Sequence, residues 1–471
     1  MNSTVFYIFQ GKLTPLIILT LVIIFSQVCK NDKVKETTKA PALVHLITLA
    51  PGHFHAALLQ KSMYNEVDST VYVFAPEGQE VKAHLALIDE YNNRKENPTA
   101  WKEKVYTGKD YLEQMLKTKP GNVVVIAGNN QIKTEYIKRS IDAGLNVLAD
   151  KPMAISTEDF DQLKDAFAEA EKKKLLLYDI MTERYEITNI LQRQFAQLPD
   201  VFGALKKGTL KNPAITSESV HYFYKEVSEA PLIRPAWYFD VNQEGEGIVD
   251  VTTHLVDLIQ WQCFPDVVLD YEKDIKMLRA KHWATVLTPS QFYSVTKQNT
   301  YPGFLQTVVK DSLLSVYSNG EMNYTIKDIH VKVSVVWNYK AANGAGDTYY
   351  SMLKGTKANL IIRQSKEQQY KPTLYIEPVD KNLKNWNEAV QAGLNEISKK
   401  NPGINLKRSN NGWEVVIPEK YKIGHEQHFS RVVKNYIQYL KEGRMPQWEI
   451  SGMLTKYYTT IQALEKAINN K

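Results

Sequence analysis

Cysteine is scarce in this chain of 471 residues, which contains only Cys29 and Cys263. So small a number predicts no disulfide framework, and Cys263, which lies in an apolar helical stretch, reads as a buried thiol. An excess of one charge is also lacking, since 58 Lys and Arg stand against 52 Asp and Glu for a formal net charge of +6. The basic residues are scattered along the chain, so the sequence predicts no nucleic-acid partner.

A long apolar run is the third thing the sequence lacks. The run at 16–25 is too short to span a bilayer comfortably and has the length of the apolar part of a secretory signal. Cys29 follows it and suggests a lipid anchor, although Val28 is larger than the small residue expected there; plain cleavage and a retained membrane anchor are the alternatives. We therefore expect residues 1–29 to be a signal or lipoprotein signal and 30–41 a linker. The protein is then exported, to the periplasm or as an outer-membrane lipoprotein.

After the linker, short apolar strands alternate with helices. Strands are expected at 43–49, 70–74, 122–127 and 146–149, with helical stretches between them. Such alternation builds a parallel sheet with helices on both faces, which binds ligands beyond the carboxyl ends of its strands. Residues 42–155 are therefore predicted to form an α/β, Rossmann-like dinucleotide-binding domain.

The pattern changes from about Gly203. Alternating or β-branched runs, such as 331–339 and 358–364, indicate a mostly antiparallel sheet, and 427–442 and 450–468 read as amphipathic helices. Residues 156–471 are therefore predicted to form an α+β domain that binds the substrate.

The first strand ends at Ala50-Pro51-Gly52-His53-Phe54-His55, where a dinucleotide fold carries G-x-G-x-x-G. Only the middle glycine is present, and it would let backbone amides approach a pyrophosphate. We expect Gly52, His53 and Phe54 to contact the cofactor, and Glu77, after the second strand, to hold its ribose. An ordinary strand–helix turn is the alternative, with Glu77 a turn residue, so NAD and NADP both stay open.

Asp150-Lys151-Pro152 follows the strand at 146–149. Pro152 stiffens the turn and favours an extended backbone at Lys151. A lysine partly withdrawn from water has a lowered pKa and can donate or relay a proton. The competing interpretation is an ordinary lysine in a surface loop.

Asp250-x-x-x-His254-x-x-Asp257 follows a glycine-rich stretch and is the most specific motif. At helical spacing the three side chains share one face. The alternative to a catalytic motif is that an acid stabilises the positive end of the helix dipole and that the histidine is packed in the core. Asp and His also bind metals, but no further residues complete a compact ligand set, so no metal is predicted.

These motifs, in this order and spacing, resemble those of the glucose-fructose oxidoreductase / inositol dehydrogenase / MocA family. Asp150-Lys151-Pro152 stands for its E-K-P, and the likeness covers about 43–265. The resemblance implies that Lys151 orients and protonates the substrate oxygen, that His254 is the acid/base and that Asp250 positions His254. It also implies that Asn129 and Asn130 contact the nicotinamide ribose.

The later part resembles the C-terminal domain of exported oxidoreductases from Bacteroidetes. The likeness rests on Trp337-x-Tyr339, Gly346-Asp347-Thr348 and Gly424-His425-Glu426-x-His428-Phe429. Antiparallel sheets of this kind commonly make oligomers in the family, so a homo-oligomer is expected by analogy.

The polar and aromatic residues before and within the motif at 250–257 suit a sugar ring. The predicted substrate residues are His221, Lys225, Arg234, Trp237 and Asp257. Together the motifs predict an exported oxidoreductase that uses tightly bound NAD or NADP to move a hydride at a carbinol of a sugar. Two alternatives are a glycosidase that oxidises, eliminates and re-reduces with the same cofactor, and a surface lipoprotein that only binds carbohydrate. No carboxylate pair of an ordinary glycosidase can be picked out.

Overall fold

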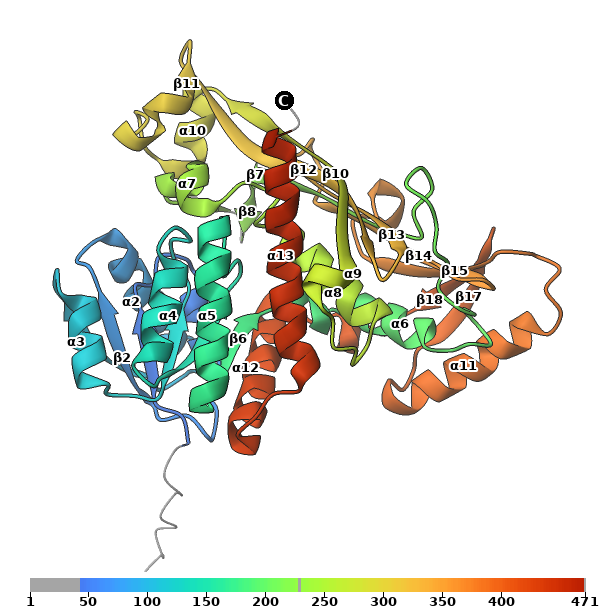
Figure 1. Cartoon of the computed structure of the whole chain (residues 1–471), viewed down its shortest axis with the longest axis horizontal. Coiled ribbons are helices and arrows are strands. Elements are labelled where there is room, and N and C mark those ends of the chain that lie inside the picture. The colour runs from blue at the N-terminus through green and yellow to red at the C-terminus, as the bar shows by residue number, and fades with distance from the viewer. Residues whose placement is uncertain (1–42, 228–229, 470–471) are drawn as a thin grey trace, which may run out of the picture. The chain divides into compact units, whose positions relative to one another are not determined.

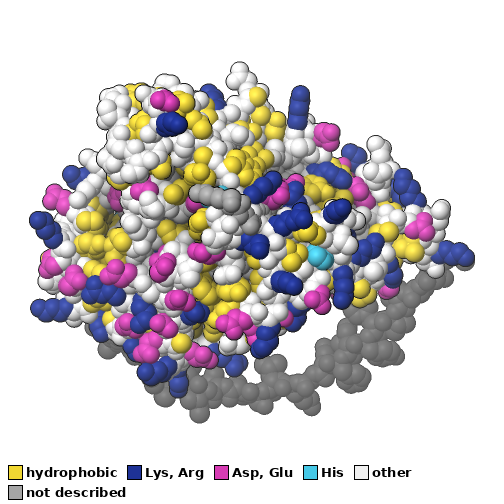
Figure 2. Space-filling model, turned by 45° about the horizontal axis from the view of Figure 1, so that its top comes forward, with side chains coloured by type: hydrophobic (Ala, Val, Ile, Leu, Met, Phe, Trp, Pro, Cys, Tyr) yellow, Lys and Arg dark blue, Asp and Glu magenta, His cyan; other side chains and the backbone are white. Residues whose placement is uncertain are grey.

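The computed structural model describes residues 43–227 and 230–469 (Figure 1). The described residues all belong to one compact unit. The predicted signal, linker and lipid-anchor residue Cys29 lie outside the described residues. Among the helices that are described, none has the length and apolar character needed to cross a membrane. Figure 2 shows charged side chains of both signs spread over the visible face.

The first sheet has six parallel strands in the order β3-β2-β1-β4-β5-β6. Every residue of β1 and of β4 is buried, as expected for strands covered on both faces. The strand order reverses between β1 and β4, which is where such sheets bind ligands. The bounds are β1 (Leu46–Leu49), β2 (Thr70–Ala75), β3 (Lys102–Thr107), β4 (Val123–Ile126), β5 (Asn146–Asp150) and β6 (Leu177–Ile180).

The sheet continues beyond residue 155, the predicted end of the domain, because β6 pairs with β5. The helix predicted after the first strand is short, a single turn of α-helix followed by a 3-10 turn. The helices of this layer are α1 (His55–Leu58), η1 (Leu59–Lys61), α2 (Gln79–Asn93), α3 (Tyr111–Thr118), α4 (Lys133–Asp142) and α5 (Thr157–Lys173). The predicted α/β class of this part is confirmed.

The second sheet runs in the order β10-β12-β13-β7-β14-β15-β16-β18-β17, with β11 paired to β12. Its pairs are antiparallel except for β13 and β7, which confirms the predicted mostly antiparallel domain. The strands are β7 (Ile215–Tyr224), β10 (Ile275–Leu287), β11 (Val309–Lys310), β12 (Leu313–Ile326), β13 (Ile329–Lys340), β14 (Thr348–Lys354), β15 (Ala358–Gln364), β16 (Thr373–Pro378), β17 (Asn405–Ser409) and β18 (Gly412–Val416), and β8 (Glu226–Val227) pairs separately with β9 (Ala230–Pro231).

Helices join the two sheets. In Figure 1 the long helix α13 lies between α5 of the first layer and β10 of the second sheet, and it also packs on α8. The helices of this part are η2 (Thr182–Tyr185), α6 (Ile187–Ala196), η3 (Ala236–Phe239), α7 (Val241–Glu244), α8 (Thr252–Cys263), α9 (Tyr271–Asp274), α10 (Pro289–Thr296), η4 (Gly303–Val308), η5 (Lys366–Gln368), α11 (Trp386–Lys400), η6 (Glu419–Tyr421), α12 (His425–Glu442) and α13 (Gln447–Asn469).

A buried network of charges ties α8 and α13 to the first layer. Asp257 accepts two hydrogen bonds from the Arg184 guanidinium, at 2.6 and 2.7 Å, and one from Lys456 at 2.9 Å. Arg184 also pairs with Glu449 at 2.8 Å, and Lys456 pairs with Asp179 of β6 at 2.6 Å. Burial alone would raise the pKa of Asp257, but Arg184 and Lys456 outweigh it and lower that pKa. Asp257 is therefore a structural residue, and its predicted contact with substrate is wrong.

Replacing Lys456 by Met should destabilise the fold strongly. The ammonium is fully buried, and its loss leaves the carboxylates of Asp179 and Asp257 short of a counter-charge. We expect about 3–5 kcal/mol less free energy of unfolding, as for other broken buried pairs. Urea unfolding of Lys456→Met measures the loss. Lys164→Met, which breaks an exposed pair with Asp161, is the control and should change stability by less than about 1 kcal/mol; an equal loss in both variants would contradict the assignment.

Candidate active site

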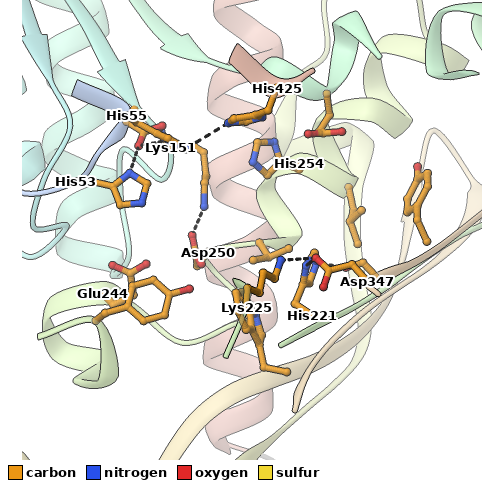
Figure 3. A pocket seen from close by; sticks show the side chains of 18 of the residues that line it. His53, His55, Lys151, His221, Lys225, Glu244, Asp250, His254, Asp347 and His425 are labelled. Carbon is orange, nitrogen blue, oxygen red and sulfur yellow. Dashed lines mark hydrogen bonds and ion pairs between the residues drawn. The ribbon is translucent and has the colours of Figure 1, made fainter. Parts of the chain in front are cut away.

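A cavity of about 530 Å³ lies at the carboxyl ends of β1, β4 and β5, between them and the second sheet (Figure 3). The volume is in the range of small-molecule sites. Most of the predicted site residues line it, although they come from many separate parts of the chain. These are His53, Phe54, Asn130, Lys151, His221, Lys225, Arg234, Trp237, Asp250 and His254; of the predicted residues, Gly52, Glu77, Asn129 and Asp257 are not in the lining.

Lys151 follows β5, on a cis peptide bond to Pro152, and its ammonium pairs with the Asp250 carboxylate inside the cavity (Figure 3). Burial alone would lower the pKa of Lys151, but Asp250, Asp150 and Glu244 outweigh it and raise that pKa. The predicted lowering is therefore wrong, because the sequence does not show how many carboxylates surround the lysine. Lys151 stays charged and acts as a hydrogen-bond donor.

His254 lies in the first turn of α8, which begins at Thr252, so Asp250 precedes the helix and is not part of it. The Nδ1 atom of His254 is buried and has no hydrogen-bond partner in the described part of the chain. Burial first, and then the charges of Lys151 and His425, hold the pKa of His254 well below its usual value. His254 is therefore a neutral imidazole at neutral pH and can accept a proton. Asp250 positions Lys151, whereas the resemblance implied that it positions His254.

The loop after β4 is fastened to α7. The Asn129 side chain donates to Gln243 at 2.7 Å, and the Asn130 side chain donates to the Glu244 carbonyl at 2.7 Å. Lys133, fully buried at the start of α4, donates to the Asn130 Oδ1 atom at 2.5 Å. Burial lowers the pKa of Lys133 to about 8. The loop predicted to meet the nicotinamide ribose is thus held in place by both domains.

The first turn has the close approach that a dinucleotide needs. A Cβ atom on Gly128 would lie 3.0 Å from the Gly52 amide nitrogen, so glycine lets the ends of β1 and β4 meet. The amides of Gly52 and His53 both donate to the Ala127 carbonyl, at 3.1 and 3.2 Å. Those two amides are therefore already paired and not free for a pyrophosphate, contrary to the expectation from the sequence. Phe54, Gly128, Asn130 and Lys151 line the cavity at this switch point and are the residues that would hold a dinucleotide there.

Trp237 connects the second domain to this turn. Its indole N–H donates to Glu80 Oε1 of α2 at 2.5 Å, and the other oxygen of Glu80 would lie 3.0 Å from a Cβ atom on Gly52. Trp237 therefore lines the cavity and also covers the first turn. Glu77 is exposed just after β2, outside the cavity lining, and its contact with ribose stays a prediction.

The wall opposite Lys151 is built around Asp347. Its Oδ2 atom accepts from Lys225 at 2.5 Å and lies 3.1 Å from Nδ1 of His221. Burial alone would raise the pKa of Asp347, but His221 and Lys225 outweigh it and lower that pKa. The Arg234 guanidinium stacks nearby, 5.4 Å from the ring centre of Trp337. This wall offers several hydrogen-bonding groups beside aromatic rings.

A cluster of histidines surrounds Asp150. Nδ1 of His55 and Nδ1 of His53 lie 2.9 and 3.4 Å from Oδ2 of Asp150, and Nε2 of His55 lies 3.2 Å from Nε2 of His425. Burial is the main cause that lowers the pKa of His55, and likewise that of His425, to about 4. All three imidazoles are thus neutral at neutral pH, since burial also lowers the pKa of His53.

Sequence reasoning missed several residues of the site. Asp347 and His425 lie in motifs that carried the resemblance, but spacing along the chain gave them no role. Glu244 precedes the glycine-rich stretch and lies near Asp250. Burial first, and then the charge of Asp250, raise the pKa of Glu244 well above its usual value. Lys133 lies four and eight residues before the buried Ile137 and Ile141, so helical spacing places it on the apolar face of α4, a signal that sequence reasoning did not use.

Two family models match the chain. Residues 47–178 match "Oxidoreductase family, NAD-binding Rossmann fold", and residues 191–468 match "Putative oxidoreductase C terminal domain". A comparison with curated proteins found no match.

Solved structures give a fuller comparison. The chain is 52% identical to a "putative oxidoreductase" from Parabacteroides merdae, over 92% of this chain and 99% of that one, with a TM-score of 0.90. A levoglucosan dehydrogenase in complex with NADH and levoglucosan is 12% identical, over 91% and 98%, with a TM-score of 0.56. A 3-ketoreductase from Actinomadura kijaniata in complex with NADP is 11% identical, over 88% and 94%, with a TM-score of 0.52. The last two likenesses show the fold alone.

The match to the C-terminal domain over more than half of the chain, the Rossmann match before it and the identity to the Parabacteroides protein agree with the geometry of the site. The chain belongs to the glucose-fructose oxidoreductase / inositol dehydrogenase / MocA family of NAD(P)-dependent oxidoreductases.

Proposed function

We propose that this oxidoreductase transfers a hydride between NAD(P) and a secondary carbinol of a sugar or sugar derivative. The observation that carries the proposal is a charged Lys151, held by Asp250, in the same cavity as a neutral His254. Oxidation of a carbinol removes a hydride from carbon and a proton from oxygen. A nicotinamide held beside Asn130 and Lys151 would supply the hydride acceptor, and the side chains of the protein handle the proton.

His254 accepts that proton from the carbinol oxygen, because its imidazole is neutral and the residue lines the cavity beside Lys151. The Lys151 ammonium donates a hydrogen bond to the same oxygen and stabilises the negative charge that develops on it. Asp250 keeps Lys151 charged and aimed into the cavity. In the reverse direction His254 returns the proton to the oxygen of a ketone.

A sugar suits the opposite wall. Asp347 accepts hydrogen bonds, Lys225 donates them, His221 can do either, and Trp337 offers a ring face beside them. Hydroxyl groups on a ring need this mixture of donors, acceptors and apolar surface. The levoglucosan dehydrogenase of the same fold binds a sugar-derived substrate, which supports the class of substrate and leaves the individual sugar open.

Export completes the proposal. Residues 1–29 have the sequence character of a signal, with Cys29 as the lipid anchor, which would place the enzyme in the periplasm or on the outer membrane. Free NAD is scarce there, so a tightly held cofactor reconciles the chemistry with that location. The contact between Trp237 and Glu80 over the first turn supports slow exchange of the cofactor. A homo-oligomer remains part of the proposal by family analogy alone.

The first prediction concerns the cofactor. The purified full-length chain, denatured without added nucleotide, should release NAD or NADP in an amount close to that of the protein. Mass spectrometry of the released fraction identifies which of the two it is. A chain that releases no nucleotide, and shows no change of intrinsic fluorescence with added NAD or NADP, would contradict the tight binding proposed here.

The second prediction concerns the two proton-handling groups. His254→Asn should lower kcat by about 10²–10⁴-fold, since it removes the group that accepts the proton. Lys151→Met combined with Asp250→Asn should lower kcat by about 10²–10³-fold while leaving no unpaired buried charge. The change in nicotinamide absorbance with the best sugar of a panel gives the rate. His45→Ala and Lys164→Met, both partly exposed and outside the cavity, are controls. Unchanged turnover in the His254 variant would contradict the role of His254.

The third prediction concerns pH. His254 must be unprotonated to accept a proton, and its pKa lies well below 6.5 because of burial, Lys151 and His425. The value of kcat/KM for sugar oxidation should therefore stay level as the pH falls from neutral to 6.5 and decline only at lower pH. A pH profile of kcat/KM measures this. A decline centred at or above pH 6.5 would mean that another group accepts the proton.

A further inference from the structure

The cluster around Asp150 has the composition and spacing of a metal site. One nitrogen of His53, one nitrogen of His55 and one oxygen of Asp150 all lie within 4.8 Å of one another. Nδ1 of His55 lies 2.9 Å from Oδ2 of Asp150, and Nδ1 of His53 lies 3.4 Å from the same oxygen. Ligand atoms bound to one metal ion at about 2.1 Å are themselves about 3.0–3.4 Å apart in octahedral or tetrahedral geometry. The two distances to Asp150 thus match the edges of a coordination shell, and the two histidine nitrogens lie within 4.8 Å of each other.

The chemistry of the cluster selects the kind of metal. Two imidazoles and one carboxylate form a mixed nitrogen and oxygen set that suits divalent transition metals such as Zn²⁺, Fe²⁺ or Co²⁺, and is too rich in nitrogen for Mg²⁺ or Ca²⁺. Three protein ligands leave open positions, and these face the cavity, because His53, His55 and Asp150 all line it. The Nδ1 atom of His53 is buried and makes no hydrogen bond within the described residues.

The Asp150 carboxylate is oriented for this role. Its Oδ1 atom accepts the Lys151 backbone N–H at 3.0 Å, so Oδ2 alone faces the two histidines. The Lys151 side chain turns away from this carboxylate to pair with Asp250 (Figure 3). The Lys151 ammonium therefore does not take the place where a cation would bind, and the nearby Lys133 ammonium donates to Asn130.

His425 supplies the outer support that metal-binding histidines usually have. When His55 binds through Nδ1, its Nε2 carries the proton and donates to Nε2 of His425, which lies 3.2 Å away. Such a contact fixes the tautomer and the ring orientation of the ligand. His425 comes from the start of α12, 370 residues along the chain from His55, and is a positioning residue in this arrangement.

From this geometry we infer that His53, His55 and Asp150 bind one divalent transition-metal ion in the wall of the cavity, with His425 orienting His55. The sequence predicted no metal because residues 53, 55 and 150 are not a compact set along the chain. The inference goes beyond the proposed dehydrogenase activity and does not rest on it, because metal binding is measured without turnover.

Titration of the untagged full-length chain with Co²⁺, after treatment with a chelator, tests the site. We expect one Co²⁺ per chain, visible absorption bands that report imidazole coordination, and displacement of these bands by Zn²⁺, which such sites bind more tightly. His53→Ala and His55→Ala should each abolish the bands at a stoichiometric amount of Co²⁺. His425→Ala should keep the stoichiometry and weaken binding by about 10–100-fold.

His45→Ala is the matched control, since this partly exposed histidine lies outside the cavity and should leave the titration unchanged. Circular dichroism and a melting curve show whether each variant is folded. If His55→Ala fails to fold, His53→Ala still tests the site, because His53 is the more exposed of the two ligand side chains. A wild-type chain without stoichiometric Co²⁺ or Zn²⁺ binding would overturn the site, as would a folded His53→Ala that binds like the wild type. The nucleotide-release measurement is separate, so failure of one proposal leaves the other standing.

Discussion

The fold depends on charges that cannot stay buried alone. Asp179, Arg184, Asp257, Glu449 and Lys456 lie almost without solvent contact, and each would be costly to bury without partners. Together they satisfy one another and connect β6 of the first sheet with η2, α8 and α13. Because α8 carries His254 and directly follows Asp250, the network sets where both groups stand in the cavity.

The same competition between desolvation and pairing sets the charges inside the cavity. Lys151 is buried but has carboxylates around it, so its charge is kept. His254 is buried beside that positive charge and beside His425, so its charge is lost. One cationic donor and one neutral base in the same cavity are what proton transfer at a carbinol needs. The division of roles therefore follows from the neighbours of each group more than from its residue type.

Sequence patterns predicted what depends on local spacing. Apolar strands alternating with helices gave the parallel sheet, and the turns after β1 and β5 gave Gly52 and Lys151. Asn130, in the turn after β4, came from the family resemblance. The same reasoning misassigned Asp257, because helical spacing says which residues share a face and not what that face meets. Its partners Arg184 and Lys456 are 73 and 199 residues away.

The pKa shifts in the cavity could not be predicted from the sequence either, because they also depend on residues far apart in the chain. The raised pKa of Lys151 depends on Asp250, which is 99 residues distant, and on Glu244 beside it. The role of Asp347 depends on a return of the chain that brings β14 beside β7. The periodicity of one segment does not show which distant segments it contacts in the fold.

The contact between His55 and His425 has a consequence for how the protein is made. During synthesis the nucleotide-binding layer leaves the ribosome long before α12 exists, and N-terminal domains usually fold first. At that stage the first turn lacks its histidine neighbour from α12 and the cover that Trp237 supplies. The first turn therefore stays unfinished until α12 and the segment that carries Trp237 have folded, and competence for chemistry arrives only with the last helices of the chain.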